Sequence, residues 1–322
     1  MKLVITVDTE EDNWGDYRST SCTLENITRI PALQRIFDDF DAKPTYLITY
    51  PVATDQTADA ILGELLEAGK CEIGTHCHPW NTPPLEEAKS KVNTMLCNLP
   101  EDLQRRKISV LHDAIQRRFN WCPVSFRSGR WGYSQAVARN LCRIGYKIDS
   151  SITPYTDWTD QHGPDFSDIS PRAFRFSGET VLQESRNGGL VEVPPTIGYV
   201  GCLSRNARVI GATHKLATGE LARRVRLMGI LSRLMLAKKV WLSPETADVV
   251  DMMKLTRRNL SDGYGFVNMV FHSSSLKHGL NPFVQTKEDE GRFLEKIRMF
   301  LSFTREAGIE SVRLSDSLRM PW

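Results

Sequence analysis

Acidic side chains crowd together directly after the first hydrophobic segment of the chain. In KLVITVDTEEDNW, residues 3–7 are mostly apolar, and four carboxylates follow within five positions, namely Asp8, Glu10, Glu11 and Asp12. Like charges this close repel one another, so a site that uses negative charge explains them better than an ordinary acid-rich turn. In an extended chain Asp8 and Glu10 point to the same side. One of them could bind a metal ion while the other accepts a proton.

Two histidines in the segment EIGTHCHPW could supply further ligands to such an ion. His76 and His78 are two positions apart and would also share one side of an extended segment. Two imidazoles and a carboxylate suit a divalent metal ion that keeps open positions for water. The alternative is a structural pair of histidines. Trp80 follows closely and could stack on a sugar ring or serve only in packing.

Three further ionisable residues end strand-like segments. Arg127 in SFRSGRWGYS, with Arg130 close behind, could hold carboxylates in their ionised form or make an ordinary ion pair. Asp149 ends YKID, and His272 ends GFVNMVFH. A histidine on a strand is often structural, but imidazole titrates near neutral pH, so His272 could also act as a general acid.

The order of the hydrophobic segments indicates which elements position these residues. Strand-like and amphipathic segments alternate, which predicts an α/β fold with a mainly parallel sheet. The ionisable residues at the strand ends would then meet at one edge, where parallel barrels keep their active sites. We expect strands at 3–7, 44–50, 71–74, 123–126, 146–149, 190–194 and 265–272. We expect helices at 27–40, 59–69, 134–145 and 287–305, and two more within 84–119 that are separated near Pro100.

Composition is that of a globular protein with one uneven feature. The chain has 322 residues, of which 41% are hydrophobic and 25% charged, with a net charge of +2 that predicts no nucleic-acid partner. Segment 203–240 has nine Lys or Arg and one acid, a net +8, so the remainder carries −6. We expect a basic helical insertion there. Its cationic face could meet an anionic membrane surface or phosphate groups on a substrate, or simply be the outer face of a core helix.

Cysteine usage and the absence of targeting signals bear on location. Seven scattered cysteines without a C-x-x-C pair argue against a disulfide framework and a cysteine-based zinc site. Such usage is typical of a reducing compartment. Neither a signal peptide nor an apolar run long enough to cross a bilayer is visible, so a cytoplasmic location is expected.

Taken in order, the motifs resemble those of a known family. TVDTEED, EIGTHCHPW, FRSGRWG, IDSS and VFHSSSL are similar to motifs of the NodB-homology polysaccharide deacetylases (carbohydrate esterase family 4), most closely of the WalW-type branch. The similarity covers essentially the whole chain. It implies a single distorted (β/α)7 barrel over residues 1–322, a divalent metal ion that is usually zinc, and removal of N-acetyl groups from amino sugars. The substrate could be a polysaccharide, a lipid-linked glycan or a nucleotide-linked sugar.

The resemblance also assigns roles to single residues. Asp8 matches the catalytic base, and Arg127 matches the arginine that holds it. His272 resembles the general acid, and Asp149 resembles the acid that supports this histidine. Substrate contacts are expected from Arg130, Trp131 and Trp80.

At the metal site the sequence departs from the family pattern. The family places its two metal histidines four residues apart, but four residues beyond His76 lies Trp80. The expected ligands are therefore Glu10, His76 and His78. The adjacent Asp-Asp of most members is also missing, which leaves Asp12 as a competitor of Glu10.

Three functions are compatible with these observations. The first is a metal-dependent hydrolase that removes an N-acetyl group from an amino sugar. The second keeps this chemistry on a formamide or another small amide. The third is a metal-free barrel that binds glycans or serves as a scaffold, and the unusual histidine spacing keeps it open.

Overall fold

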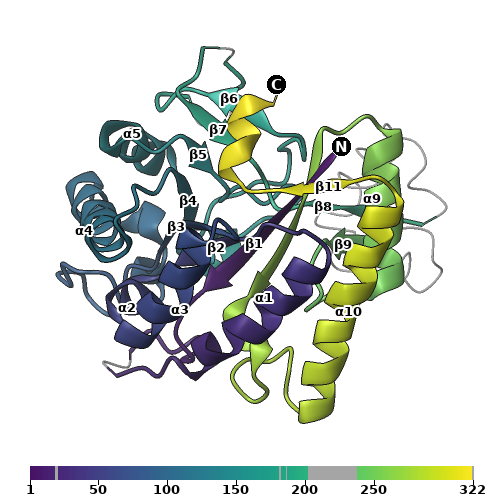
Figure 1. Cartoon of the computed structure of the whole chain (residues 1–322). Helices are drawn as coiled ribbons and strands as arrows, with labels where there is room; N and C mark the ends of the chain where they lie inside the picture. Colours follow the sequence, from purple (N-terminus) through teal and green to yellow (C-terminus); the bar gives the residue numbers. More distant parts are fainter. Residues whose placement is uncertain (19–20, 181–182, 186, 202–237, 321–322) are drawn as a thin grey trace.

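The centre of the protein is a nine-stranded sheet (Figure 1). The computed structural model describes residues 1–18, 21–180, 183–185, 187–201 and 238–320. Every pairing in this sheet is parallel except that of β6 with β7. The strand order is β10 (Phe266–His272), β1 (Lys2–Thr9), β2 (Thr45–Ile48), β3 (Glu72–Cys77), β4 (Ser125–Ser128), β5 (Ile148–Asp149), β7 (Leu190–Glu192) and β6 (Phe174–Phe176), and β11 (Glu310–Val312) also pairs with β1.

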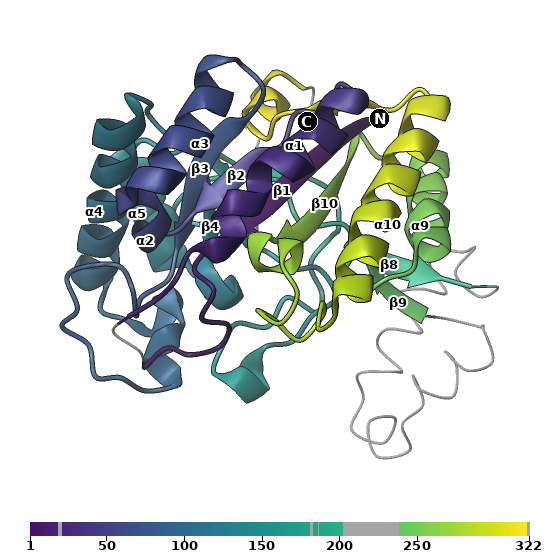
Figure 2. The ribbon, with the colours of Figure 1, turned by 60° about the horizontal axis from the view of Figure 1, so that its bottom comes forward.

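Helices surround the curved sheet on its outside, as the two ribbon views show (Figures 1 and 2). Alternation along β1 explains the layering, because Ile5 and Val7 join the cluster that includes helix residues, whereas Val4 joins a second buried cluster with Leu47 and Ile148. The helices are α1 (Ile30–Asp39), α2 (Tyr50–Thr54), α3 (Gln56–Glu67), α4 (Glu101–Phe119), α5 (Gln135–Ile144), α9 (Val249–Ser261) and α10 (Lys287–Glu306).

Irregular chain closes the gap between the two ends of the sheet. The Thr196 amide donates to the carbonyl oxygen of Asn268 in β10 at 3.1 Å, and the Val270 amide donates to that of Leu242 at 3.0 Å. Leu242 in turn donates its amide hydrogen to the Thr196 carbonyl at 2.8 Å. The sheet is therefore curled into a distorted barrel, which confirms the predicted fold class.

A separate two-stranded ribbon flanks the basic segment. β8 (Ile197–Val200) pairs antiparallel with β9 (Lys238–Trp241). Most of segment 203–240, to which we assigned the helical insertion and the membrane contact, lies outside the described residues, which resume at Lys238. The described end of the basic segment belongs to a strand. Within the described part of the chain, no helix combines the length and apolar character that a membrane crossing requires.

Of the two helices expected within 84–119, the first, before Pro100, does not form. α4 begins only at Glu101, and a buried lysine from that helix binds the chain that leads into the preceding stretch. The Lys107 ammonium group donates hydrogen bonds to the carbonyl oxygens of Pro79, Thr82 and Pro84 at 2.9, 2.8 and 2.7 Å. These carbonyls are held by the lysine and not by a helical turn. The stretch before α4 forms only the short 3-10 turns Val92–Thr94 and Leu96–Asn98.

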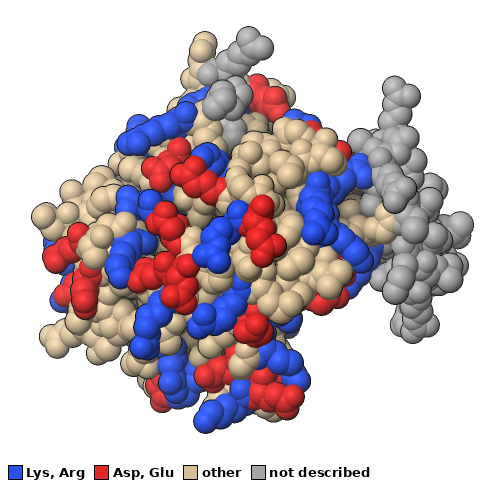
Figure 3. Space-filling model, turned by 45° about the vertical axis from the view of Figure 1, so that its right-hand side comes forward, with Lys and Arg blue, Asp and Glu red and all other residues tan. Residues whose placement is uncertain are grey.

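Surface charges of both signs are interspersed on the face shown in Figure 3, apart from what the grey atoms cover. Ion pairs of exposed side chains join neighbouring elements, for example Arg298 of α10 with Asp39 of α1 at 3.3 Å. Such exposed pairs contribute little to stability. Because charges of both signs are interspersed, the described part of this face shows no broad patch of one sign.

Candidate active site

The carboxyl ends of β1 and β10 bring the expected base and acid together. Asp8 and His272 are register partners on these neighbouring parallel strands, so both side chains leave the sheet on the same side. The His272 Nε2 atom lies 3.9 Å from the Asp8 Oδ2 atom. Asp8 is buried, whereas the His272 side chain is 21% exposed. A reacting group at this edge can therefore reach both residues.

Arg127 of β4 fixes the Asp8 carboxylate. Its Nη1 atom donates to Asp8 Oδ1 at 2.6 Å, and the guanidinium also donates to Thr6 Oγ1 at 2.8 Å and to the Ser150 carbonyl oxygen at 2.9 Å. Burial raises the pKa of Asp8, but the positive charge of Arg127, with smaller contributions from His76 and His272, outweighs it and holds that pKa below its usual value. Asp8 is thus kept ionised and able to accept a proton.

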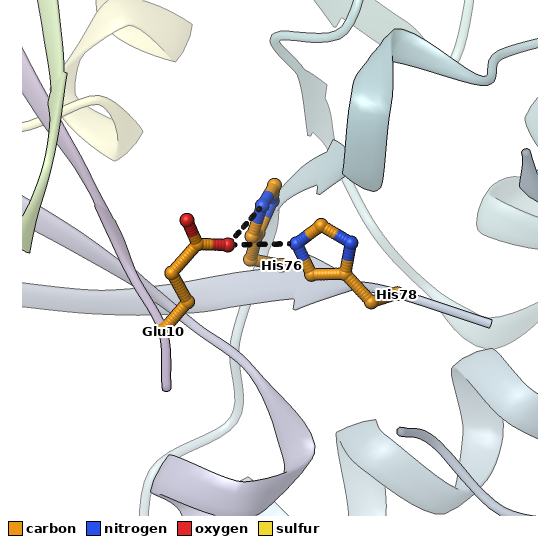
Figure 4. A group of neighbouring side chains, drawn as sticks. All are labelled: Glu10, His76 and His78. Atoms are coloured by element: carbon orange, nitrogen blue, oxygen red, sulfur yellow. Dashed lines mark hydrogen bonds and ion pairs between the residues drawn. The ribbon is translucent and has the colours of Figure 1, made fainter. Parts of the chain in front are cut away.

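Glu10, His76 and His78 form a compact group of metal-binding side chains (Figure 4). One donor atom from each lies within 4.8 Å of those of the other two. Glu10 Oε2 is 2.9 Å from His78 Nε2 and 3.8 Å from His76 Nε2. Burial, the largest cause in each case, lowers the pKa of both histidines to about 4 and raises the pKa of Glu10. Neutral imidazoles are the form that binds metal.

The two histidines are held by different means. His76 Nδ1 lies 3.3 Å from the Arg127 carbonyl oxygen, an acceptor that turns Nε2 toward Glu10. His78 is held by close packing, because a Cβ atom at Gly129 would lie only 2.4 Å from His78 Nδ1. Only glycine fits at that position, so the end of β4 and the ring of His78 lie in direct contact.

Asp12, the competing acid, has a structural role. Its carboxylate accepts hydrogen bonds from Thr23 Oγ1 at 2.7 Å, from the Glu25 amide at 2.7 Å and from Asn26 Nδ2 at 2.6 Å. These bonds fix the loop that precedes α1. Among the described residues the metal-binding group is therefore completed by Glu10 and not by Asp12.

Glu245 is a site residue that the sequence analysis missed. Its carboxylate accepts from the His272 amide at 2.9 Å, from His272 Nδ1 at 3.1 Å and from Ser275 Oγ at 2.5 Å. Burial lowers the pKa of His272, but the charge and hydrogen bonds of Glu245, followed by the charges of Glu10 and Asp8, raise it to about 10. His272 is consequently protonated at neutral pH with Nε2 facing Asp8.

Asp149 lies elsewhere, which corrects the contact with His272 that the resemblance implied. Its Oδ1 atom accepts from Ser151 Oγ at 2.6 Å, and it is the register partner of Glu192 in β7. Both carboxyl groups are fully buried. Burial raises the pKa of each, and the charge of Asp149 raises that of Glu192 further. Asp149 is engaged by Ser151, and the partner of His272 Nδ1 is Glu245 from the loop before α9.

A cleft of about 920 Å³ opens above these residues and is lined by all three expected substrate residues, Arg130, Trp131 and Trp80. The Trp131 ring lies 5.7 Å from that of Trp241 and 5.3 Å from the guanidinium carbon of Arg127. Trp80 packs on His78 with ring centroids 4.1 Å apart. Flat apolar faces beside a few polar groups are suited to sugar rings. The aromatic lining comprises Trp14, Tyr17, Trp80, Trp131, Trp158, Trp241 and Phe283.

Comparison with known proteins gives matches in structure only. No family model and no curated protein sequence matches the chain. A candidate glycoside hydrolase/deacetylase from Parabacteroides distasonis aligns with a TM-score of 0.59 and 12% identity, over 97% of this chain and 69% of that one. This likeness shows a shared fold, in agreement with the distorted barrel.

Two further structures extend the comparison. A family 4 carbohydrate esterase from Streptomyces lividans, in complex with acetate, aligns with a TM-score of 0.44 and 10% identity over 96% of this chain and 91% of that one. A family 4 pseudoenzyme from Bacillus anthracis aligns with a TM-score of 0.45 and 8% identity over 98% and 64%.

Proposed function

We propose that the protein is a metal-dependent hydrolase that removes an N-acetyl group from an amino sugar of a glycan or glycan precursor. The observation that carries the proposal is the convergence of an ionised Asp8, a protonated His272 and the group of Glu10, His76 and His78 on one aromatic cleft. The similarity of the sequence motifs to the WalW-type branch of the deacetylases agrees with it.

The donor set fits a divalent cation of the zinc type. Two imidazole nitrogens and one carboxylate oxygen are ligands that zinc prefers at catalytic sites with an open position. Ligand atoms around a tetrahedral ion are about 3.4 Å apart for bonds of about 2.1 Å. The separations of 2.9 and 3.8 Å from Glu10 Oε2 bracket that value. A cation bound there would supply Lewis acidity toward a carbonyl oxygen.

The remaining chemistry belongs to three side chains. Asp8 accepts a proton from the water whose oxygen attacks the acyl carbon, and Arg127 keeps Asp8 ionised and aligned. As the C–N bond breaks, His272 donates its proton from Nε2 to the leaving amine, while Glu245 holds Nδ1 and stabilises the imidazolium. The products are a carboxylic acid and an amino sugar. Deformylation of a formamide follows the same steps and differs only in the acyl group.

One observation favours the metal-free glycan-binding alternative. The contact of 2.9 Å between His78 Nε2 and Glu10 Oε2 gives each of these two atoms a partner without a cation. Metal analysis separates the alternatives.

The purified protein is expected to bind about one equivalent of zinc and to release acetate from an N-acetylated chitooligosaccharide. His76→Ala removes one of three ligands and is expected to lower metal content and activity together, by tenfold or more. Inductively coupled plasma mass spectrometry and an enzymatic acetate assay, with a parallel formate assay, measure these outcomes. His278→Ala, which removes a partly exposed histidine paired with Glu290, is the matched control and should change neither. A stable wild-type protein that takes up no divalent metal yet binds the oligosaccharide would establish the binding protein instead.

Glu245→Gln is expected to move the alkaline limb of the pH dependence of kcat/KM to lower pH. The limb arises because a general acid is lost when His272 deprotonates, and the carboxylate of Glu245 is what raises the pKa of this histidine most strongly against burial. An amide keeps the shape but removes the charge, so we expect a shift of at least about one pH unit. Glu288→Gln, at an exposed position of α10, is the control. An unchanged alkaline limb would show that Glu245 does not act through His272.

A further inference from the structure

Arg130 occupies a forced position at the wall of the cleft. It directly follows Gly129, which lies against the ring of His78, so its place next to the metal-binding group is set by the backbone. Its own backbone is left-handed, with φ 52° and ψ 24°, and that of Trp131 is left-handed as well, with φ 62°. Residues other than glycine rarely adopt this conformation, and such strain is concentrated at functional sites.

The guanidinium of Arg130 is oriented by neutral partners. Nη1 donates to Thr94 Oγ1 at 2.7 Å, and Nη2 donates to Gln161 Oε1 at 3.0 Å. Among the residues that the structure describes, no carboxylate lies within 4.0 Å of this group. These two bonds use two of the five N–H groups of the guanidinium. The group is therefore held in place, while no neighbouring carboxylate neutralises its charge.

The acids of the cleft nearly all have partners other than Arg130. Asp8 is paired with Arg127, Glu10 lies beside His78, and Glu245 lies beside His272. The remaining acid, Asp160, is exposed at the rim on the same short turn as Gln161. Lys91, also exposed, adds a second cation to the lining.

We propose that Arg130 binds an anionic group, a carboxylate or a phosphate, carried by the substrate next to the amino sugar. This inference rests on the proposed function in one respect, namely that the reacting amino sugar lies at the metal-binding group. A planar guanidinium with free N–H donors forms paired hydrogen bonds with either anion. Its partial burial strengthens the contact relative to one made in bulk water. An acidic glycan or a nucleotide- or lipid-diphosphate-linked sugar is therefore a better substrate than a neutral chitin-like oligomer, which is a weaker one.

Calorimetric titration of the full chain tests this with two matched pairs of probes. A hyaluronan hexasaccharide against chitohexaose tests a carboxylate, and UDP-N-acetylglucosamine against free N-acetylglucosamine tests a phosphate. In at least one pair the charged member should bind at least about tenfold more tightly. Arg130→Gln should abolish this difference while leaving binding of the neutral member within about twofold. Arg130→Lys should retain part of the difference.

Two further variants keep the result interpretable. Asp160→Asn should strengthen binding of the charged probe, because it removes the opposing charge at the rim. Arg117→Gln, on the exposed side of α4, is the matched control and should have no effect.

Wild-type protein that binds neither charged probe better than its neutral counterpart, or Arg130→Gln that weakens both members of a pair equally, would overturn the inference. Acetate release without preference for charge would refute this inference alone, whereas charge-dependent binding without any amide hydrolysis by metal-loaded protein would refute only the proposed function.

Discussion

Replacing Asp8 with asparagine is expected to lower kcat for amide hydrolysis by about 10²- to 10⁴-fold. The amide is nearly the same size as the carboxylate, and its oxygen can still accept the hydrogen bond from Arg127 Nη1. It cannot, however, take up the proton that the attacking water must lose. Initial rates of acetate release under saturating substrate, corrected for the folded fraction, measure the effect.

Metal content shows whether Asp8→Asn lowers activity through loss of the general base or through loss of the metal ion. Glu10, His76 and His78 are unchanged, so metal content should stay at the wild-type value while turnover falls. Asp113→Asn, at an exposed position of α4, removes one acid far from strand β1 and should behave as wild type. Turnover of Asp8→Asn within about threefold of wild type would remove Asp8 from the proton transfer.

The convergence of the main site residues could be predicted from the sequence because it follows from parallel strands. The hydrophobic runs of β1 and β10 lead to Asp8 and His272, and parallel pairing brings strand ends to one edge. His76 and Arg127 are likewise register partners on β3 and β4. The pattern placed His76 after its strand, but β3 extends to Cys77 because the chain stays buried and paired that far.

Glu245 could not be found in this way because no hydrophobic run leads to it. It follows β9, a short strand that pairs only with β8 among the described residues, and it precedes α9. In SPETADVV an acid just before a helix is an ordinary feature of helix starts, which favour negative charge. Only the folded chain brings it to His272, 27 positions later.

Short strands and irregular chain were the other elements that local patterns could not reveal. β6, β8 and β9 span three or four residues each, too few for a clear alternation of apolar and polar positions. The stretch before α4 has helical composition, but at its start the Pro84 carbonyl is bound by Lys107, 23 positions later in the sequence. Tertiary contacts of this kind override local propensity.

Replacing Arg127 with methionine is expected to lower the free energy of unfolding by about 3–5 kcal/mol. The Arg127 side chain is fully buried, and that of its partner Asp8 is 2% exposed, so the variant leaves a buried carboxylate without its cation. Three further acceptors, Thr6 Oγ1, Ser150 Oγ and the Ser150 carbonyl, also lose their donor. Urea denaturation followed by circular dichroism measures the change, provided that the m-value is unaltered.

Arg106→Met provides the matched comparison. Arg106 makes a two-pronged pair with Glu86, at 2.6 Å for each oxygen, but both side chains are well exposed, at 38% and 54%. Water already solvates these charges, so the loss should be at most about 1 kcal/mol. Equal losses in the two variants would contradict the argument from burial.

The double variant Asp8→Asn with Arg127→Met isolates the ionic part of the effect. Removing both charges leaves no uncompensated ion in the barrel, so the double variant should be more stable than the sum of the single changes predicts, by about 1–3 kcal/mol. Additive losses would mean that Arg127 stabilises the barrel through its neutral acceptors and not through Asp8. In that case its hydrogen bonds to Thr6 and Ser150 would tie β4 to β1 and β5, and the ionisation of Asp8 would depend on the histidines around it.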